Sequence, residues 1–210
     1  MNRNQTTHLV ARSLAGICRF HRDIAKFVSV TLLLGLSVSP VQAKPKSNFL
    51  NPGGNVVAPD GARQLCEVNA WACSVSPKTG KILKSDMAEI VKVNRSVNRR
   101  TREVADITQF RVEEKWTLPT ARGGDCEDFA LLKKRDLIRL GYPAQSLLIA
   151  TVLDTNRRGH AVLIVRTDKG DFVLDNLTDQ IKSWSDTGYI FLRMQNPKKP
   201  TGWVRLASAT

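Results

Sequence analysis

Three side chains that together can perform acyl transfer are spread through the second half of the sequence. Cys126 follows two glycines in "GGDCEDF", His160 opens the apolar run "HAVLIVRT", and Asp175 ends the run "DFVLD". A thiol becomes a strong nucleophile when a neighbouring imidazole accepts its proton, and a carboxylate bound to the imidazole fixes its tautomer. The three residues therefore predict a nucleophilic cysteine site, provided that the fold brings them together.

The segment around Cys126 has the pattern of a helix start. The free backbone N–H groups and the dipole of a first helical turn stabilise a thiolate, and Gly123 and Gly124 allow a sharp turn before the helix. Asp125 and Glu127 act in the opposite direction, because their negative charge raises the pKa of the thiol unless a cation neutralises them. Asp125 is also a good N-cap residue, so a purely structural role for the acids stays open.

The placement of His160 and Asp175 depends on one β-hairpin. With "TDKG" (167–170) as its loop, Arg166 pairs with Asp171, and the same register makes His160 and Asp175 diagonal neighbours on one face of the sheet. A slip of one residue would place them on opposite faces. A lone histidine at a strand start and an Asp-Asn pair after a strand are also typical of surface and turn positions. Zinc is disfavoured, because one histidine and widely spaced cysteines do not match structural zinc sites.

The remaining pattern changes from helical to extended along the chain. Apolar spacing predicts helices over 85–104 and 125–141, the second closed by Gly141 and Pro143. Strands are predicted over 146–155, 160–167, 171–177, 188–195 and 202–207. Because no helix separates these strands, we expect an α+β fold with N-terminal helices and an antiparallel sheet.

The first 43 residues are typical of a signal peptide. Five basic residues between Arg3 and Lys26 precede the apolar run "FVSVTLLLGLSVSP", and "VQA" (41–43) offers small residues for cleavage after Ala43. The apolar run is shorter than the roughly 18 residues of a spanning helix, which disfavours an uncleaved anchor. We therefore expect a signal peptide at 1–43, a mostly irregular lead-in at 44–64 and the catalytic domain at 65–210, with no membrane span after cleavage and an exported mature chain.

Cleavage would change the inventory of reactive groups. Two of the three histidines and Cys18 lie in the leader, which leaves His160 as the one imidazole of the mature chain. Cys66 and Cys73, in "CEVNAWAC", are close enough to close a small loop, and exported proteins tend to pair their thiols. We predict a disulfide between these two cysteines and a free thiol at Cys126.

The formal net charge of +13 favours anionic surfaces or acidic partners. The basic run "NRSVNRRTR" (94–102) has no interleaved aromatic residues and matches no nucleic-acid-binding module. We interpret this run as a solvated helix face and expect no nucleic-acid partner.

Several motifs, taken in order, resemble the bacterial transglutaminase-like cysteine peptidases, which include the periplasmic LapG-like proteases. The motifs are "GGDCEDFALLKKRDLIRLGYP", "GHAVLIV" and "FVLDNLT", with "VNRSVN" (93–98) and "KWTLP" (115–119) upstream. The resemblance implies a papain-like, transglutaminase-like core and a Cys-His-Asp triad at Cys126, His160 and Asp175. It also implies a calcium ion near the nucleophile, held by Asp125 and Glu127.

The predicted activity is hydrolysis of a protein substrate, such as a cell-surface or periplasmic protein, through a thioester acyl-enzyme. The backbone N–H of Cys126 is the expected oxyanion donor, and Asn94 or Trp116 is a candidate second donor. Two alternatives stay open. The same residues would serve a transglutaminase or amidase that transfers the acyl group to another acceptor, and an inactive binding module would keep the fold with a structural Cys126.

Overall fold

The computed structural model describes residues 47–76 and 82–206. The predicted signal peptide, residues 1–43, lies outside this part of the chain. The helices are α1 (Leu65–Val68), α2 (Met87–Arg100), α3 (Asp106–Phe110) and α4 (Cys126–Arg139), with short 3₁₀ turns at Asp60–Ala62, Ala70–Cys73, Lys84–Asp86, Ala144–Ser146 and Trp184–Asp186. The strands are β1 (Pro52–Val56), β2 (Leu147–Leu153), β3 (Gly159–Arg166), β4 (Asp171–Leu174), β5 (Lys182–Ser183), β6 (Ile190–Gln195) and β7 (Trp203–Leu206).

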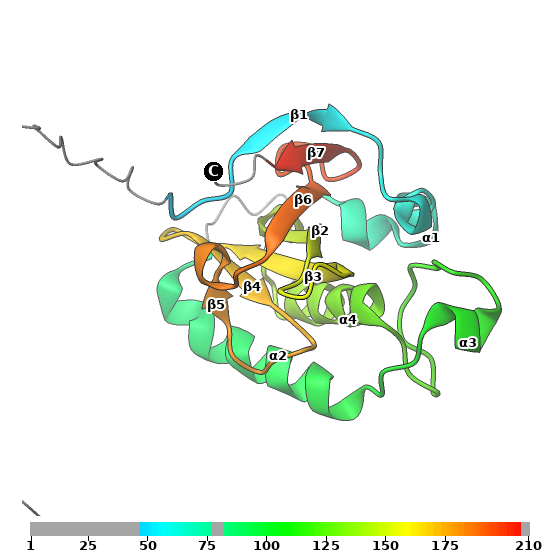
Figure 1. The fold of residues 1–210 in the computed structure, drawn as a ribbon. Coiled ribbons are helices and arrows are strands. Elements are labelled where there is room, and N and C mark those ends of the chain that lie inside the picture. The colour runs from blue at the N-terminus through cyan, green and yellow to red at the C-terminus, as the bar shows by residue number, and fades with distance from the viewer. Residues whose placement is uncertain (1–46, 77–81, 207–210) are drawn as a thin grey trace, which may run out of the picture. The chain divides into compact units, whose positions relative to one another are not determined.

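In the described residues, the seven strands form one antiparallel sheet in the order β1-β7-β6-β2-β3-β4-β5 (Figure 1). Helix α4 packs against β2 and β3 at the centre of the sheet, and α2 packs against α4. The α+β class with an antiparallel sheet is therefore confirmed. The predicted hairpin register is also confirmed, because Arg166 pairs with Asp171 and the ladder continues to Leu163 and Leu174.

The two faces of the sheet bury separate apolar clusters. Side chains alternate between the faces of a strand, and β2 and β3 are apolar at almost every position. Leu147, Ile149 and Leu163 pack with Leu131 of α4 on one face. On the other face, the cluster consists of Leu50, Leu148, Ala150, Val152, Val162, Ile164, Val173, Trp184, Phe191, Met194, Val204 and Leu206. Burial on both faces explains the continuous apolar runs and fixes α4 relative to β3.

The lead-in is more ordered than its composition predicts. Residues 44–64 were expected to be mostly irregular, but β1 lies within them and pairs with β7 at the edge of the sheet. The segment "PGGNV" carries no alternation of apolar and polar residues, and four of its five residues are exposed. The strand exists because the backbone of β7 offers it hydrogen bonds, which is a tertiary effect that local composition does not report.

The predicted cysteine pairing is present. Cys66 is bonded to Cys73 with a Cα–Cα distance of 5.5 Å, and Cys126 is the free cysteine of the described residues. Within the same residues, no helix has both the length and the apolar character needed to cross a membrane.

A buried ion pair closes the β3–β4 hairpin and joins it to the N-terminal segment. Asp171 is fully buried and accepts hydrogen bonds from the Arg166 guanidinium at 2.7 and 2.8 Å and from the Leu50 N–H at 2.8 Å. Arg166 also donates to the Leu50 carbonyl at 3.0 Å. Because the register of this hairpin places His160 beside Asp175, the ion pair supports the candidate site from a distance.

We predict that Asp171→Ala lowers the free energy of unfolding by about 3–5 kcal/mol, because it leaves a partly buried guanidinium and a buried N–H without their acceptor. Urea unfolding measures this change. Asp60→Ala is the control, since Asp60 pairs with Arg63 in an exposed salt bridge that contributes at most about 1 kcal/mol. Equal effects of the two substitutions would contradict the structural role of Asp171.

Candidate active site

A tight backbone turn positions the start of α4. Gly123 has a φ of +124°, and a Cβ added to it would lie 2.1 Å from the carbonyl oxygen of Arg102. The N–H of Gly124 donates to that carbonyl at 3.1 Å, and the Gly124 carbonyl accepts from the Val104 N–H at 2.9 Å. Only glycine fits this conformation and this separation. The turn therefore fixes Cys126, the first residue of α4, relative to the segment 101–104.

Cys126 lies at the helix start in a partly buried, negatively charged setting. Its thiol donates to Glu127 Oε2 at 3.3 Å. Burial and the charge of Glu127 raise the pKa of the Cys126 thiol, and a hydrogen bond from the backbone N–H of Ala161 opposes them. Cys126 and His160, on β3, line the same two cavities.

His160 and Asp175 are in direct contact, as the hairpin register predicted. His160 Nε2 lies 2.9 Å from Asp175 Oδ1, and both side chains are almost fully buried. Asp175 Oδ1 also accepts from the Leu177 N–H at 3.0 Å, and Oδ2 accepts from the Tyr189 hydroxyl at 2.6 Å. Burial alone would raise the pKa of Asp175, but the bonds from His160, Tyr189 and Leu177 lower it below its ordinary value.

Helix α2 holds the loop that follows Asp175. Asn98 Nδ2 donates to the Asp175 carbonyl at 2.9 Å and to the Thr178 carbonyl at 3.2 Å. Asn94, one turn earlier and fully buried, directs its amide at the carbonyls of Thr178 and Asp179. Asn94 lines neither cavity next to Cys126. Its contacts are those of a residue that supports the loop rather than an oxyanion donor.

A cleft of about 410 Å³ opens over Cys126 and His160, and Trp116 and Thr151 also line it. Trp116 is buried against Trp203, and its indole N–H donates to Glu114 Oε2 at 3.0 Å. A second cavity of about 210 Å³ is lined by Cys126 and His160 together with Glu103 and Asn176. An extended peptide chain therefore has space on both sides of the Cys126–His160 pair.

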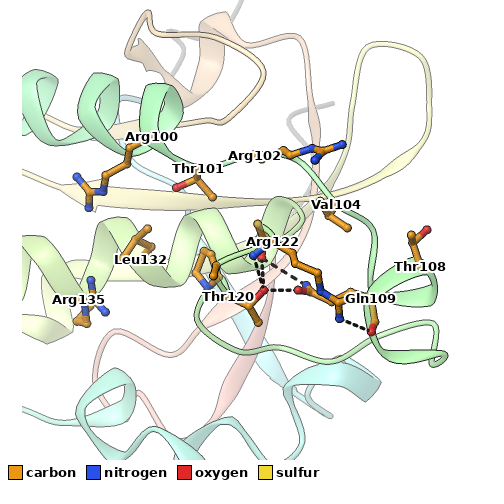
Figure 2. Close-up of a pocket in the computed structure, with 13 residues that line it drawn as sticks. Arg100, Thr101, Arg102, Val104, Thr108, Gln109, Thr120, Arg122, Leu132 and Arg135 are labelled. Carbon is orange, nitrogen blue, oxygen red and sulfur yellow. Dashed lines mark hydrogen bonds between the residues drawn. The ribbon is translucent and has the colours of Figure 1, made fainter.

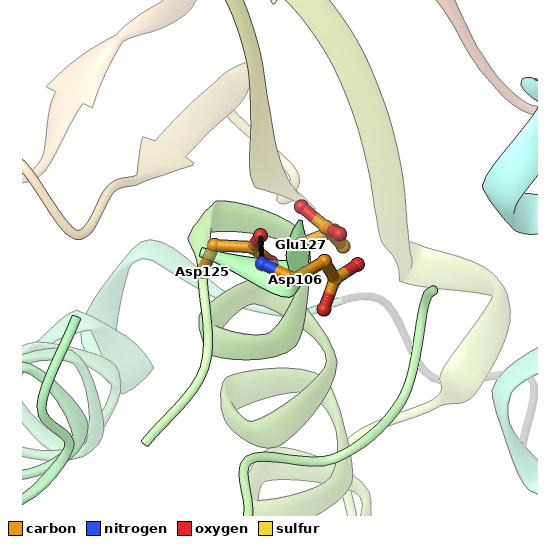
Figure 3. Close-up of side chains that lie close together, drawn as sticks. All are labelled: Asp106, Asp125 and Glu127. Atoms are coloured by element: carbon orange, nitrogen blue, oxygen red, sulfur yellow. Dashed lines mark hydrogen bonds between the residues drawn. The ribbon is translucent and has the colours of Figure 1, made fainter. Parts of the chain in front are cut away.

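Three carboxylates converge at the start of α4, and two of them, Asp125 and Glu127, are the sequence neighbours of Cys126 (Figure 3). One oxygen from each of Asp106, Asp125 and Glu127 lies within 4.8 Å of the other two. Asp125 occupies the N-cap position of α4, but its side chain makes no cap hydrogen bond. Instead its Oδ2 accepts from the Asp106 N–H at 3.0 Å. Asp125 is therefore the N-cap residue by position, as the sequence indicated, but its side chain does not cap the helix. Asp106 is a third acid that the sequence did not indicate.

The cluster is short of positive charge and of hydrogen-bond donors in the described part of the chain. Oδ1 of Asp106 and Oδ1 of Asp125 are buried without a hydrogen-bond partner. Burial raises the pKa of Asp106, and burial together with the charge of Asp125 raises the pKa of Glu127. Buried carboxylate oxygens without donors are costly unless a cation binds them. Hard oxygen donors of this kind suit Ca²⁺.

The sequence profile of the bacterial transglutaminase-like cysteine proteinases matches residues 53–210. The chain belongs to this family. It is therefore a cysteine peptidase of the transglutaminase-like type, as the motifs around Cys126, His160 and Asp175 predicted. The matched region begins inside β1, so the family domain includes the strand that the sequence analysis assigned to the lead-in.

Solved structures of LapG from Legionella pneumophila are similar to this chain. The calcium-bound form is 27% identical, with a TM-score of 0.48, over 59% of this chain and 72% of that chain. The EGTA-treated form is 25% identical, with the same TM-score and coverage. No curated protein matches the chain.

Two residues at the site have little sequence signal. Tyr189 lies in "GYIFLRMQ", which indicates only a strand, and its hydroxyl reaches Asp175 because β6 returns beside β2. Asp106 lies 19 residues before Asp125, on a short helix that no periodicity predicts. In both residues the contact is set by the tertiary fold rather than by local spacing.

We predict that Tyr189→Phe lowers kcat about tenfold, because it removes a hydrogen bond to the carboxylate that orients His160. The variant should also lose stability at neutral pH, and this loss should shrink as the pH falls through the lowered pKa of Asp175, where the carboxylate becomes protonated. Peptide-cleavage kinetics and urea unfolding at two pH values measure these effects.

Tyr142→Phe is the matched control, since the Tyr142 hydroxyl also donates to a carboxylate at 2.6 Å, that of Glu89, away from the cleft. A Tyr189→Phe enzyme with the kcat of the Tyr142→Phe enzyme would contradict a positioning role for Tyr189.

Proposed function

We propose that the protein is an exported cysteine peptidase in which Cys126 is the nucleophile, His160 is the general acid and base, and Asp175 orients His160. The observation that carries this assignment is the buried 2.9 Å contact between His160 Nε2 and Asp175 Oδ1 in a cleft that Cys126 also lines. Because Nε2 is engaged with Asp175, the other ring nitrogen, Nδ1, is left to exchange a proton with the thiol.

The reaction follows from these roles. The Cys126 sulfur attacks the scissile carbonyl carbon after His160 takes its proton, and the backbone N–H of Cys126 donates to the developing oxyanion. His160 then protonates the leaving amine, which yields a thioester. Water, activated by His160, hydrolyses the thioester and releases Cys126. Of the two side chains predicted as a second oxyanion donor, only Trp116 lines the cleft. Its single donor, the indole N–H, is bonded to Glu114 Oε2, so Trp116 would have to exchange that hydrogen bond to serve the oxyanion.

We further propose that Asp106, Asp125 and Glu127 hold a calcium ion. The support is the convergence of three carboxylates and the two buried oxygens without donors, which a divalent cation would satisfy. Calcium takes six to eight oxygen ligands, so backbone carbonyls or water would complete the shell. The ion supplies positive charge beside Glu127, which offsets the negative charge that faces the Cys126 thiol.

Export is part of the proposal. The basic and apolar pattern of residues 1–43 indicates a signal peptide, and the Cys66–Cys73 disulfide is typical of an oxidising compartment such as the periplasm. The substrate is then a protein met after export, in the periplasm or at the cell surface.

We predict that the purified protein cleaves one or a few proteins of a periplasmic and outer-surface extract, and that Cys126→Ala abolishes the cleavage because no other group supplies the sulfur nucleophile. New N-termini identified by mass spectrometry measure the products and their cleavage sites. The Cys126→Ala protein is the control for host proteases. The same fragments from both proteins would refute the nucleophile, and incorporation of an added amine into glutamine without any fragment would establish the transglutaminase alternative.

We predict that calcium raises the melting temperature relative to a chelator by roughly 5–10 °C, because saturating ligand stabilises a domain of this size by about 3 kcal/mol. Asp106→Asn should reduce this rise by at least about half, since it replaces a carboxylate ligand by an amide. Thermal unfolding followed by circular dichroism measures both values. Glu113→Gln is the control, because Glu113 is exposed and lies outside the acid cluster. A calcium effect that is absent, or equal in the two variants, would refute the site.

A further inference from the structure

A third pocket, larger than the catalytic cleft, is lined in part by Gly123 of the turn that positions Cys126 (Figure 2). Its volume is about 680 Å³, within the range of ligand-binding sites. The walls are the end of α2, the segment 101–104, residues of α3, residues 119–123 and part of α4. We call it the arginine pocket, because Arg100, Arg102, Arg122 and Arg135 line it.

The arginine pocket carries an excess of positive charge. Its lining contains four arginines and no acidic residue. Arg100 and Arg135 share a single carboxylate, that of Asp136, and Arg122 donates to the backbone carbonyl of Gln109 at 2.9 Å. Their side chains keep access to solvent, with 45% of Arg100 and 25% of Arg135 exposed. One carboxylate therefore pairs with two of the four guanidinium groups, and the lining itself supplies no other.

The other lining groups suit a peptide rather than a bare ion. Thr101, Thr108 and Thr120 add hydroxyl groups, and Val104 and Leu132 add apolar surface. Guanidinium groups bind carboxylates through two parallel hydrogen bonds, while hydroxyl groups and apolar patches contact backbone and aliphatic stems. A chain that carries several Asp or Glu side chains matches this combination of charge, donors and size.

The position of the arginine pocket ties it to the catalytic cleft. Along the extended segment 102–104, Arg102 and Val104 line the arginine pocket, whereas Glu103 lines the smaller cavity shared with Cys126 and His160. Alternate side chains of an extended segment point in opposite directions. The two sites therefore lie on opposite sides of one segment, which is bonded to Gly124.

We propose that the arginine pocket is an exosite that binds an acidic stretch of the protein substrate, away from the bond that is cleaved. This inference rests on the proposed peptidase function, because a peptidase substrate is a protein chain long enough to occupy both sites. The run 94–102, which the sequence analysis interpreted as a solvated helix face, then contributes two of its arginines, Arg100 and Arg102, to substrate binding.

The test is direct binding to the Cys126→Ala protein, which separates this inference from catalysis. The probe is a synthetic peptide of alternating Glu and Gly, with a Gln and Gly peptide of equal length as the neutral comparison. We expect the acidic peptide to bind, the neutral peptide not to bind, and added salt to weaken the complex. Isothermal titration calorimetry measures the affinity.

The double variant Arg102→Gln/Arg122→Gln should weaken binding of the acidic peptide about tenfold, because two charged donors are lost. The matched control is Arg95→Gln/Arg99→Gln, which removes the same charge from exposed residues of α2 outside the arginine pocket and should change the affinity by less than about twofold. Thermal unfolding verifies that both proteins fold. Arg102→Lys/Arg122→Lys should retain part of the affinity, because it keeps the charge and loses only the paired geometry.

Equal affinity of the two Gln double variants would overturn the exosite, and so would equal binding of the neutral peptide. Inorganic phosphate that displaces the acidic peptide at equal charge concentration would overturn it in favour of a small-anion site. None of these results bears on cleavage by the wild-type enzyme. Conversely, if the wild-type protein cleaved no substrate, the measured binding of the acidic peptide would still stand.

Discussion

The turn through Gly123 and Gly124 is packed against the segment 101–104 with no room for a side chain between them. An added Cβ at Gly123 would overlap the Arg102 carbonyl, and the two segments exchange backbone hydrogen bonds on either side of this contact. The contact fixes where α4 begins, and it brings α3, which starts two residues after Val104, beside the first turn of α4. Asp106 reaches Asp125 for this reason. The position of Cys126, the acid cluster and the wall of the arginine pocket all depend on this one close approach of two backbones.

The sequence predicted those parts of the site that depend on local pattern. The helix start at Cys126 follows from two glycines and the apolar spacing behind them, and the contact of His160 with Asp175 follows from one hairpin loop of four residues. Asp106 and Tyr189 were missed because their partners lie on other elements, and no short-range period reports such contacts. Strand β1 was missed because its hydrogen bonds come from β7 rather than from its own composition. The local pattern indicated Cys126, His160 and Asp175. Tertiary packing determines which other residues contact them.

Helix α2 shows the same difference between what a local sequence pattern indicates and what tertiary contacts decide. The motif "VNRSVN" contributed to the family resemblance, and Asn94 was one of two candidates for a second oxyanion donor. In the structure Asn94 and Asn98 lie one turn apart on the helix and bind backbone carbonyls of the loop that follows Asp175. Amide side chains at this spacing can hold a loop at two points, because residues i and i+4 share one helix face. The family motif is explained by the position of Asp175, which is held by Asn98 of α2 and by Tyr189, the residue directly before β6.

The two halves of the candidate site differ in how many of their charged groups have hydrogen-bond partners among the described residues. Asp175 is buried and charged, yet His160, Tyr189 and the Leu177 N–H supply its partners. The described residues themselves therefore hold His160 and Asp175 in place. On the side of Cys126, Asp106 and Asp125 each have a buried oxygen without a donor, and burial together with the Glu127 carboxylate raises the pKa of the Cys126 thiol. The proposed calcium ion would supply the positive charge that this half of the site lacks. Activity would then depend on the cation through the thiol of Cys126 and the start of α4, while the contact between His160 and Asp175 would stay the same with or without it.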